Sequence, residues 1–225
     1  MWREKNLGDF LVMSDTVIVL DFETTGMSPH LGARPTEVAA VRVENGQIVD
    51  RYQSLMYGGV YVPAFITELT GITNAMVREA PGVDRDMRDL HAFIGRHPVV
   101  AHNASFDRKF LEAEWRRLRL TQASMMLCSL LVSRRLYPEA VSHKLGALVA
   151  YLDLPQTGRY HRALADAEMT AHLWVKMRRD IAERFGYHTV PLALMEQLQA
   201  ISKGRAAAWL EAYRDQHGLS ARTLE

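Results

Sequence analysis

The first half of the chain alternates short apolar runs with polar breaks. Residues 16–22 (TVIVLDF), 36–43 (TEVAAVRV) and 47–55 (QIVDRYQSL) have the composition and alternation of β-strands. The tripeptide ENG separates the second run from the third and is a tight-turn signal, so we predict an antiparallel hairpin there. A fourth apolar run, 98–102 (PVVAH), predicts one more short strand.

Helical spacing of apolar positions dominates the second half of the chain. The stretches with this spacing are 83–95, 103–120, about 126–136, 143–151 and 163–184. The connection over 56–82 favours short helices joined by loops. Strands followed by helices, with one further strand among them, predict a mixed α/β fold.

The pattern breaks at RFGYHTVP, which we interpret as a boundary. The predicted segments are an N-terminal extension (1–15), a main domain (16–185) and a helical C-terminal extension (186–225). Apolar residues at helical spacing after residue 191 and the run AAAWLEAY indicate the helices of that extension. We expect them to pack against the main domain; the alternative is a partner-binding tail.

Composition narrows the class of protein only slightly. Of 225 residues, 48% are hydrophobic and 24% charged, with a net charge of +1, as in an ordinary globular protein without a strongly basic surface. Cys128 is the only cysteine and cannot form an internal disulfide. No apolar run approaches the ~20 residues of a membrane span. We therefore expect a soluble, cytoplasmic protein with no membrane partner.

Two acids at the end of the first apolar run suggest chemistry. Side chains alternate along a strand, so Asp21 and Glu23 share one face, while Phe22 points to the other and belongs to the core. Two like charges repel, and burial increases the cost. Because no Lys or Arg lies nearby in the sequence, a divalent cation is favoured over a salt bridge. The plain alternative is two solvated acids at a strand end.

A third acid and a fourth follow at a helix start and within a helix. Asp107 lies in HNASFD, where Asn103 is the predicted N-cap of the helix. Asp166 lies in HRALADAEM, five residues after His161. On a continuous helix these two would be about 140° apart, so they converge only if His161 precedes the helix. A surface acid and a helix-end histidine are the alternatives.

Taken together, the segments DFET, HNASFD and HRALAD resemble the three motifs of the DEDD exonuclease superfamily. The resemblance covers about residues 16–183 and is to the histidine-bearing subclass, most of all to the proofreading 3′→5′ exonuclease (epsilon) subunits of bacterial DNA polymerase III. The segment LTGIT and the AP at 80–81 are also typical of these domains. The tyrosine-bearing subclass does not fit, because Arg162 stands four residues before Asp166.

This resemblance implies a ribonuclease-H-like fold, in which a mixed sheet combines an antiparallel hairpin with parallel strands and is flanked by helices. It implies two divalent metal ions, Mg²⁺ with Mn²⁺ as a substitute. The carboxylates that it makes metal ligands are Asp21, Glu23, Asp107 and Asp166.

The same resemblance assigns the remaining site residues. His161 becomes the general base that takes a proton from the attacking water. Thr24 is expected to hold the terminal nucleotide through its backbone, and Asn103 is a second substrate-binding candidate. Five basic residues are candidate phosphate contacts, although a solvated helix face explains them equally well: Arg108, Lys109, Arg116, Arg117 and Arg119.

We therefore expect an enzyme that hydrolyses the 3′ end of single-stranded or frayed DNA and releases nucleoside 5′-monophosphates. An exoribonuclease that trims RNA or degrades short oligonucleotides is the alternative, and a noncatalytic nucleic-acid-binding relative is a further one. The expected partner is nucleic acid with a free 3′ end. A polymerase or another protein is a candidate partner for residues 186–225.

Overall fold

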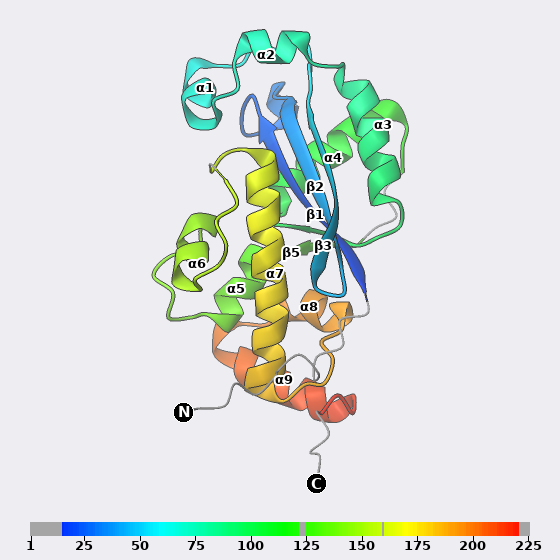
Figure 1. The fold of residues 1–225 in the computed structure, drawn as a ribbon. Coiled ribbons are helices and arrows are strands. Elements are labelled where there is room, and N and C mark those ends of the chain that lie inside the picture. Colours follow the sequence, from blue (N-terminus) through cyan, green and yellow to red (C-terminus); the bar gives the residue numbers. More distant parts are fainter. Residues whose placement is uncertain (1–14, 122–124, 159, 221–225) are drawn as a thin grey trace.

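A computed structural model describes residues 15–121, 125–158 and 160–220 of the chain (Figure 1). Its sheet has five strands in the order β3-β2-β1-β4-β5. Their bounds are β1 Thr16–Thr24, β2 Pro35–Glu44, β3 Gln47–Leu55, β4 Val99–Ala101 and β5 Met126–Cys128. Strands β1, β2 and β3 pair antiparallel, whereas β4 and β5 join parallel to β1. The mixed sheet of a ribonuclease-H-like fold is thus confirmed.

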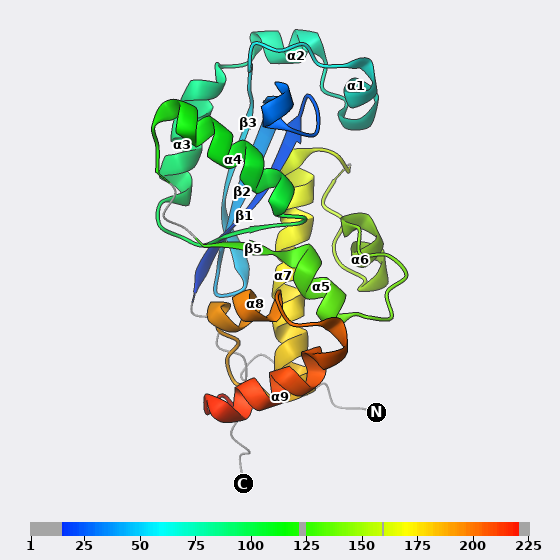
Figure 2. The same ribbon diagram turned by 180° about the vertical axis from the view of Figure 1, so that it is seen from behind.

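Helices cover both faces of the sheet (Figures 1 and 2). Before β4 come α1 Ala64–Thr70, α2 Asn74–Glu79 and α3 Val83–Ile94. After it come α4 Ser105–Leu118, α5 Ser129–Leu136, α6 Leu145–Tyr151, α7 Ala163–Phe185, α8 Leu192–Leu198 and α9 Ala206–Gln216. Short 3₁₀ turns lie at Pro29–Leu31 and Lys203–Arg205.

Alternation along β1 divides the core into two layers. Val17 and Val19 belong to an apolar cluster on the α7 side of the sheet. Leu20 and Phe22 belong to a second cluster, on the side of α3 and α4. Since Phe22 is only 4% exposed, its predicted place in the core is confirmed. The same alternation places Asp21 and Glu23 on the α7 side of the sheet, in line with Val17 and Val19.

Two local predictions are wrong. The stretch expected to be helical over 126–136 begins with strand β5, because Met126–Cys128 pair in parallel with β4, and the helix starts only at Ser129. Asn103 is not the N-cap of α4: its φ is 68°, and the capping position is Ala104, without a side-chain cap. A left-handed residue therefore turns the chain between β4 and α4.

The helices after residue 191 pack against the rest of the chain, as expected. Leu194, Leu198 and Leu210 belong to the same apolar cluster as Val17 and α7. The Gln199 side chain also accepts a hydrogen bond of 2.8 Å from the backbone N–H of Cys128. Along the described part of the chain, no helix combines the length and apolar character that crossing a membrane requires.

Candidate active site

The end of β1 places two carboxylates at the edge of the sheet. Asp21 and Glu23 are both half-buried, on the face that the alternation predicts. The pairing of β1 with β2 shifts register between Glu23 and Thr24, which marks a bulge. Bulges bend a strand and change the direction of its side chains. The bulge at the end of β1 therefore lies directly after the two half-buried acids.

Helix α4 brings the third acid to this edge. Asp107 lies in the first turn of α4 and is 2% exposed. Its Oδ1 accepts a hydrogen bond of 3.2 Å from the backbone N–H of Phe22, which stands between the two acids of β1. This bond joins segments that are 85 residues apart in sequence. It fixes the helix to the strand at the point where the carboxylates meet.

The start of α7 supplies the last acid and the histidine. Because α7 begins at Ala163, His161 precedes the helix, as the prediction required. The backbone N–H of His161 donates a hydrogen bond of 2.8 Å to Asp166 Oδ2, and its φ is 62°. One ligand atom from each of Glu23, His161 and Asp166 lies within 4.8 Å of the others. The turn thus holds the imidazole next to the acids.

Burial and mutual repulsion make this a carboxylate cluster that favours protons or cations. Burial, and then Asp107 and the other acids, raise the pKa of Asp21 well above its ordinary value. Burial also raises the pKa of Glu23 to about 8. For Asp107, burial raises the pKa to about 8, although the N–H of Phe22 opposes the shift. The pKa of Asp166 is raised by burial as well.

The donor set fits divalent metal ions. Within the described ranges, no Lys or Arg forms an ion pair with any of the four acids. Hard cations such as Mg²⁺ prefer carboxylate oxygens and retain several waters, so four carboxylates suffice for them. A bound cation would remove the repulsion that raises these pKa values.

A fifth acid, which the sequence interpretation missed, anchors the turn that carries the histidine. Glu37 on β2 is fully buried opposite Glu23. Arg162 donates to both of its carboxylate oxygens, at 3.1 and 2.8 Å. The N–H of Ala163 adds a bond of 3.0 Å to the same carboxylate. Glu37 therefore fixes both residues that follow His161. A charged residue inside the buried strand TEVAAV was the available signal.

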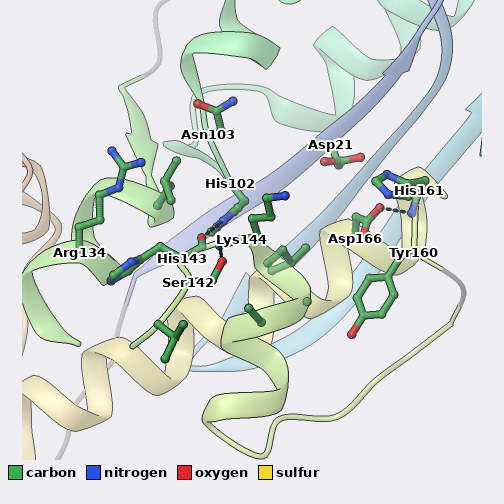
Figure 3. A pocket seen from close by; sticks show the side chains of 15 residues that line it. Asp21, His102, Asn103, Arg134, Ser142, His143, Lys144, Tyr160, His161 and Asp166 are labelled. Atoms are coloured by element: carbon green, nitrogen blue, oxygen red, sulfur yellow. Dashed lines mark hydrogen bonds between the residues drawn. The ribbon is translucent and has the colours of Figure 1, made fainter. Parts of the chain in front are cut away.

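Two of the four acids line a cavity of about 960 Å³, seen from close by in Figure 3. Asp21, His161 and Asp166 line one end of it, and Asn103 also lines the wall. Thr24 is buried, and its hydroxyl donates to the carbonyl of Gly26 at 2.7 Å, so its side-chain donor is already used within the chain. The basic residues predicted on α4 do not line this cavity.

Metal-free protein is expected to lose stability as the pH rises. Carboxyls of an unfolded chain titrate near pH ~4, whereas burial raises the pKa of Glu23 in the folded protein to about 8. Between these values the folded state retains a proton that the unfolded state has released, so the free energy of unfolding falls with increasing pH. Thermal melts in excess chelator should show a melting temperature that declines from about pH 5 to about pH 8.

Added Mg²⁺ or Mn²⁺ should reverse this loss, and more strongly at the higher pH, because metal binding requires deprotonated carboxylates. The same melts with and without the cation measure the effect. A melting temperature that responds neither to pH nor to the cation would contradict the clustered, raised pKa values.

The mixed sheet, the acids from three elements and the histidine before α7 define a class, the metal-dependent 3′→5′ exonucleases of the histidine-bearing DEDD type. Residues 18–174 match the model of the RNase T family, which is described as an exonuclease family. The chain belongs to this exonuclease family.

Similar sequences include two bacterial proteins named DNA polymerase III. The chain is 38% identical over 197 residues to the PolC-type DNA polymerase III of Bacillus cereus, an alignment that covers 87% of this chain and 14% of that protein. It is 31% identical over 176 residues to the DNA polymerase III subunit epsilon of Aquifex aeolicus, covering 78% and 86% respectively. The chain thus corresponds to a small part of PolC but to most of epsilon.

Solved structures with the same fold include two nucleases. Exonuclease X in complex with 5′-overhanging duplex DNA is 26% identical, with a TM-score of 0.62, and the match covers 81% of this chain and 99% of that one. The nuclease domain of 3′hExo, a DEDDh family member bound to rAMP, is 22% identical, with a TM-score of 0.64 and coverage of 75% and 94%. At this level of sequence identity, the similarity to the 3′hExo domain shows a shared fold and nothing more.

Proposed function

We propose that this exonuclease removes nucleotides from the 3′ end of single-stranded or frayed DNA and releases nucleoside 5′-monophosphates. The observation that carries the proposal is the convergence of four carboxylates and His161 from β1, α4 and the start of α7, with Asp21, Asp166 and His161 lining one end of a cavity. In this proposal two divalent ions are held by the carboxylates, Mg²⁺ with Mn²⁺ as a substitute. The names of the sequence relatives, DNA polymerase III proteins, favour DNA.

The metal ligands in this proposal are Asp21, Glu23, Asp107 and Asp166. When bound, the two ions stabilise the charge on the attacking and leaving oxygens of an in-line phosphodiester displacement. In this proposal His161 accepts the proton of the attacking water through its exposed imidazole. The His161 backbone is held by its hydrogen bond to Asp166, and Ala163, two residues later, is held by Glu37. The backbone at Thr24, beside the bulge, and the Asn103 side chain contact the terminal nucleotide.

Two broader aspects of the proposal rest on the relatives. Because these relatives are polymerase III proteins, we propose a polymerase partner and a cytoplasmic site of action. The segment 186–225 is the candidate contact for such a partner. RNA is the second candidate substrate, because one structure with the same fold contains rAMP. A noncatalytic nucleic-acid-binding protein is the last alternative, and it would need neither the histidine nor the metal ligands.

Digestion of matched oligonucleotides tests the substrate. We expect 5′-labelled single-stranded DNA to shorten stepwise from its 3′ end in Mg²⁺, faster than RNA of the same sequence. Paired ends should be cut more slowly, since unpairing a base costs a few kcal/mol. A bulky group on the 3′ hydroxyl should protect the strand.

Each outcome of this digestion separates the alternatives. Faster cleavage of RNA would favour the exoribonuclease. Release of the 5′ label as the first mononucleotide would contradict the polarity, and binding without cleavage in every metal tested would favour the noncatalytic relative.

A further inference from the structure

The cavity continues beyond the acids, between α5 and α6, and its chemistry changes along the way (Figure 3). Asp21 and Asp166 line the acidic end. The remaining wall contains two cationic side chains, Arg134 from α5 and Lys144 from the loop before α6, together with exposed Val141. One cavity therefore combines a carboxylate end with a basic and partly apolar end.

The two basic side chains of this wall are available to a ligand. Arg134 and Lys144 are exposed, and neither side chain donates a hydrogen bond or forms an ion pair within the described part of the chain. Arg135, the neighbour of Arg134, shows the contrast: its guanidinium donates to the carbonyls of Ile201 and Leu131, both at 2.9 Å. The chain thus uses one of two adjacent arginines for its own packing and leaves the other facing the cavity.

The loop that presents Lys144 is held in place. His102, next to β4, contacts the carbonyl of His143 at 2.9 Å through Nε2, and a carbonyl can only accept, so this nitrogen carries the proton. The Nδ1 of the same ring lies 2.9 Å from the hydroxyl of Ser129. The Nε2 of His143 in turn donates to the carbonyl of Tyr137 at 3.1 Å. These bonds tie the loop to β4 and to the two ends of α5.

The size of the cavity suits more than one nucleotide. Its volume of about 960 Å³ lies at the upper end of the range of about 300–1,000 Å³ for small-molecule pockets. A single strand carries one negative charge on each phosphate, and its sugars and bases present apolar faces. The acids repel every phosphate that is not held with a cation, so the unpaired Arg134 and Lys144 are the favourable contacts for the phosphates further along the strand.

We propose that Arg134 and Lys144 bind the backbone phosphates on the 5′ side of the scissile bond and so hold the last few nucleotides of a single strand. This inference rests on the proposed function, since it assumes that the reacting phosphate lies at the acids. Val141 and the neighbouring apolar side chains Leu130 and Leu145 provide the surface for sugars and bases. Contacts of this kind hold any sequence, because each nucleotide has the same phosphate.

The test compares a long substrate with a minimal one. Arg134→Gln, Lys144→Gln and the double variant are assayed on a single-stranded oligonucleotide and on the p-nitrophenyl ester of thymidine 5′-monophosphate. The ester has a single phosphodiester and reaches only the acids. For the oligonucleotide, KM should rise about 10-fold per variant, the effect of losing one charge-assisted contact, while kcat is retained. Both constants for the ester should remain unchanged.

Binding without turnover provides a second readout. Fluorescence anisotropy of a labelled single strand is measured in excess chelator over a range of salt concentrations. The double variant should bind more weakly, and its dependence of log K on log salt should be shallower by about 0.7 for each lost phosphate contact. DNA and RNA strands of one sequence should both respond, because the contacts are to phosphates.

The matched control is the pair Arg88→Gln and Arg179→Gln. These arginines are exposed on α3 and α7 and lie outside the cavity, and each change removes the same charge. Binding and KM should stay within about 2-fold of the wild type.

Two results would overturn the proposed phosphate contacts of Arg134 and Lys144: an equal loss on ester and oligonucleotide, or a loss in the control as large as that in the cavity variants. If the wild type cleaved neither substrate but bound single strands through these two residues, the proposed function would fail while the phosphate contacts remained.

Discussion

Replacement of Asp21 or Asp166 by Asn should reduce exonuclease turnover by about 10³-fold or more, to the level seen with excess chelator. Each change removes a carboxylate from the cluster but keeps the size of the side chain. Loss of one preorganised electrostatic group costs about 10²–10³-fold in kcat. Loss of a metal ligand should cost at least as much, because the bound ions would stabilise both the attacking and the leaving oxygen. Single-turnover cleavage of a labelled strand at saturating Mg²⁺ measures the effect.

Stability separates this loss from misfolding. Since burial and the acids around Asp21 raise its pKa, Asp21→Asn should make the metal-free protein at least as stable as the wild type near neutral pH. Glu168→Gln is the matched control, because Glu168 lies on α7 near Asp166 but pairs with Arg51 on the outside of β3. This control should retain its activity. Full turnover in the Asp21 variant would rule out the metal assignment.

Replacement of His161 should reduce kcat by about 10²–10⁴-fold, the usual contribution of a positioned acid–base group, with a much smaller effect on KM. His161→Asn is the better variant, because His161 has a φ of 62° and Asn tolerates this left-handed conformation whereas Ala does not. The Asn side chain cannot accept and release a proton near neutral pH.

The pH profile identifies the role. In the wild type, the rate should fall at acidic pH, because a general base must be unprotonated to accept a proton, and this fall should be weaker in His161→Asn. Equal losses in the Asn and Ala variants would show that backbone strain contributes little. If the Asn variant instead lost metal-dependent stabilisation, His161 would be a ligand. A wild-type rate with an unchanged profile would refute the role altogether.

Local patterns predicted the parts of the site that are set by local geometry. Alternation along β1 placed Asp21 and Glu23 on one face, and helical geometry required His161 to precede α7; both features follow from a few adjacent residues. The role of Glu37 could not be found in this way. Its partner Arg162 lies 125 residues away, and only the folded sheet brings the two together.

The wrong predictions have a related cause. Met126–Cys128 is a short apolar stretch that periodicity cannot assign to helix or strand, and its pairing with β4 decides the outcome. Asparagine favours both N-cap positions and left-handed backbone conformations. At the sharp turn from β4 into α4, Asn103 adopts the left-handed conformation. In both places, contacts distant in sequence override a local preference.

The apolar cluster on the α7 side of the sheet has a consequence for the synthesis of the protein. It joins Val17, among the earliest described residues, to Leu210 and Tyr213 near the far end. A ribosome adds about 5–20 residues per second, so after their own synthesis α7 waits a few seconds, and β1 about 10–40 s, for the last members of this cluster. During that interval the nascent chain exposes apolar surface that α8 and α9 later bury. The nuclease site, although built entirely from residues before Ala167, therefore acquires its full support only after α9 has been synthesised.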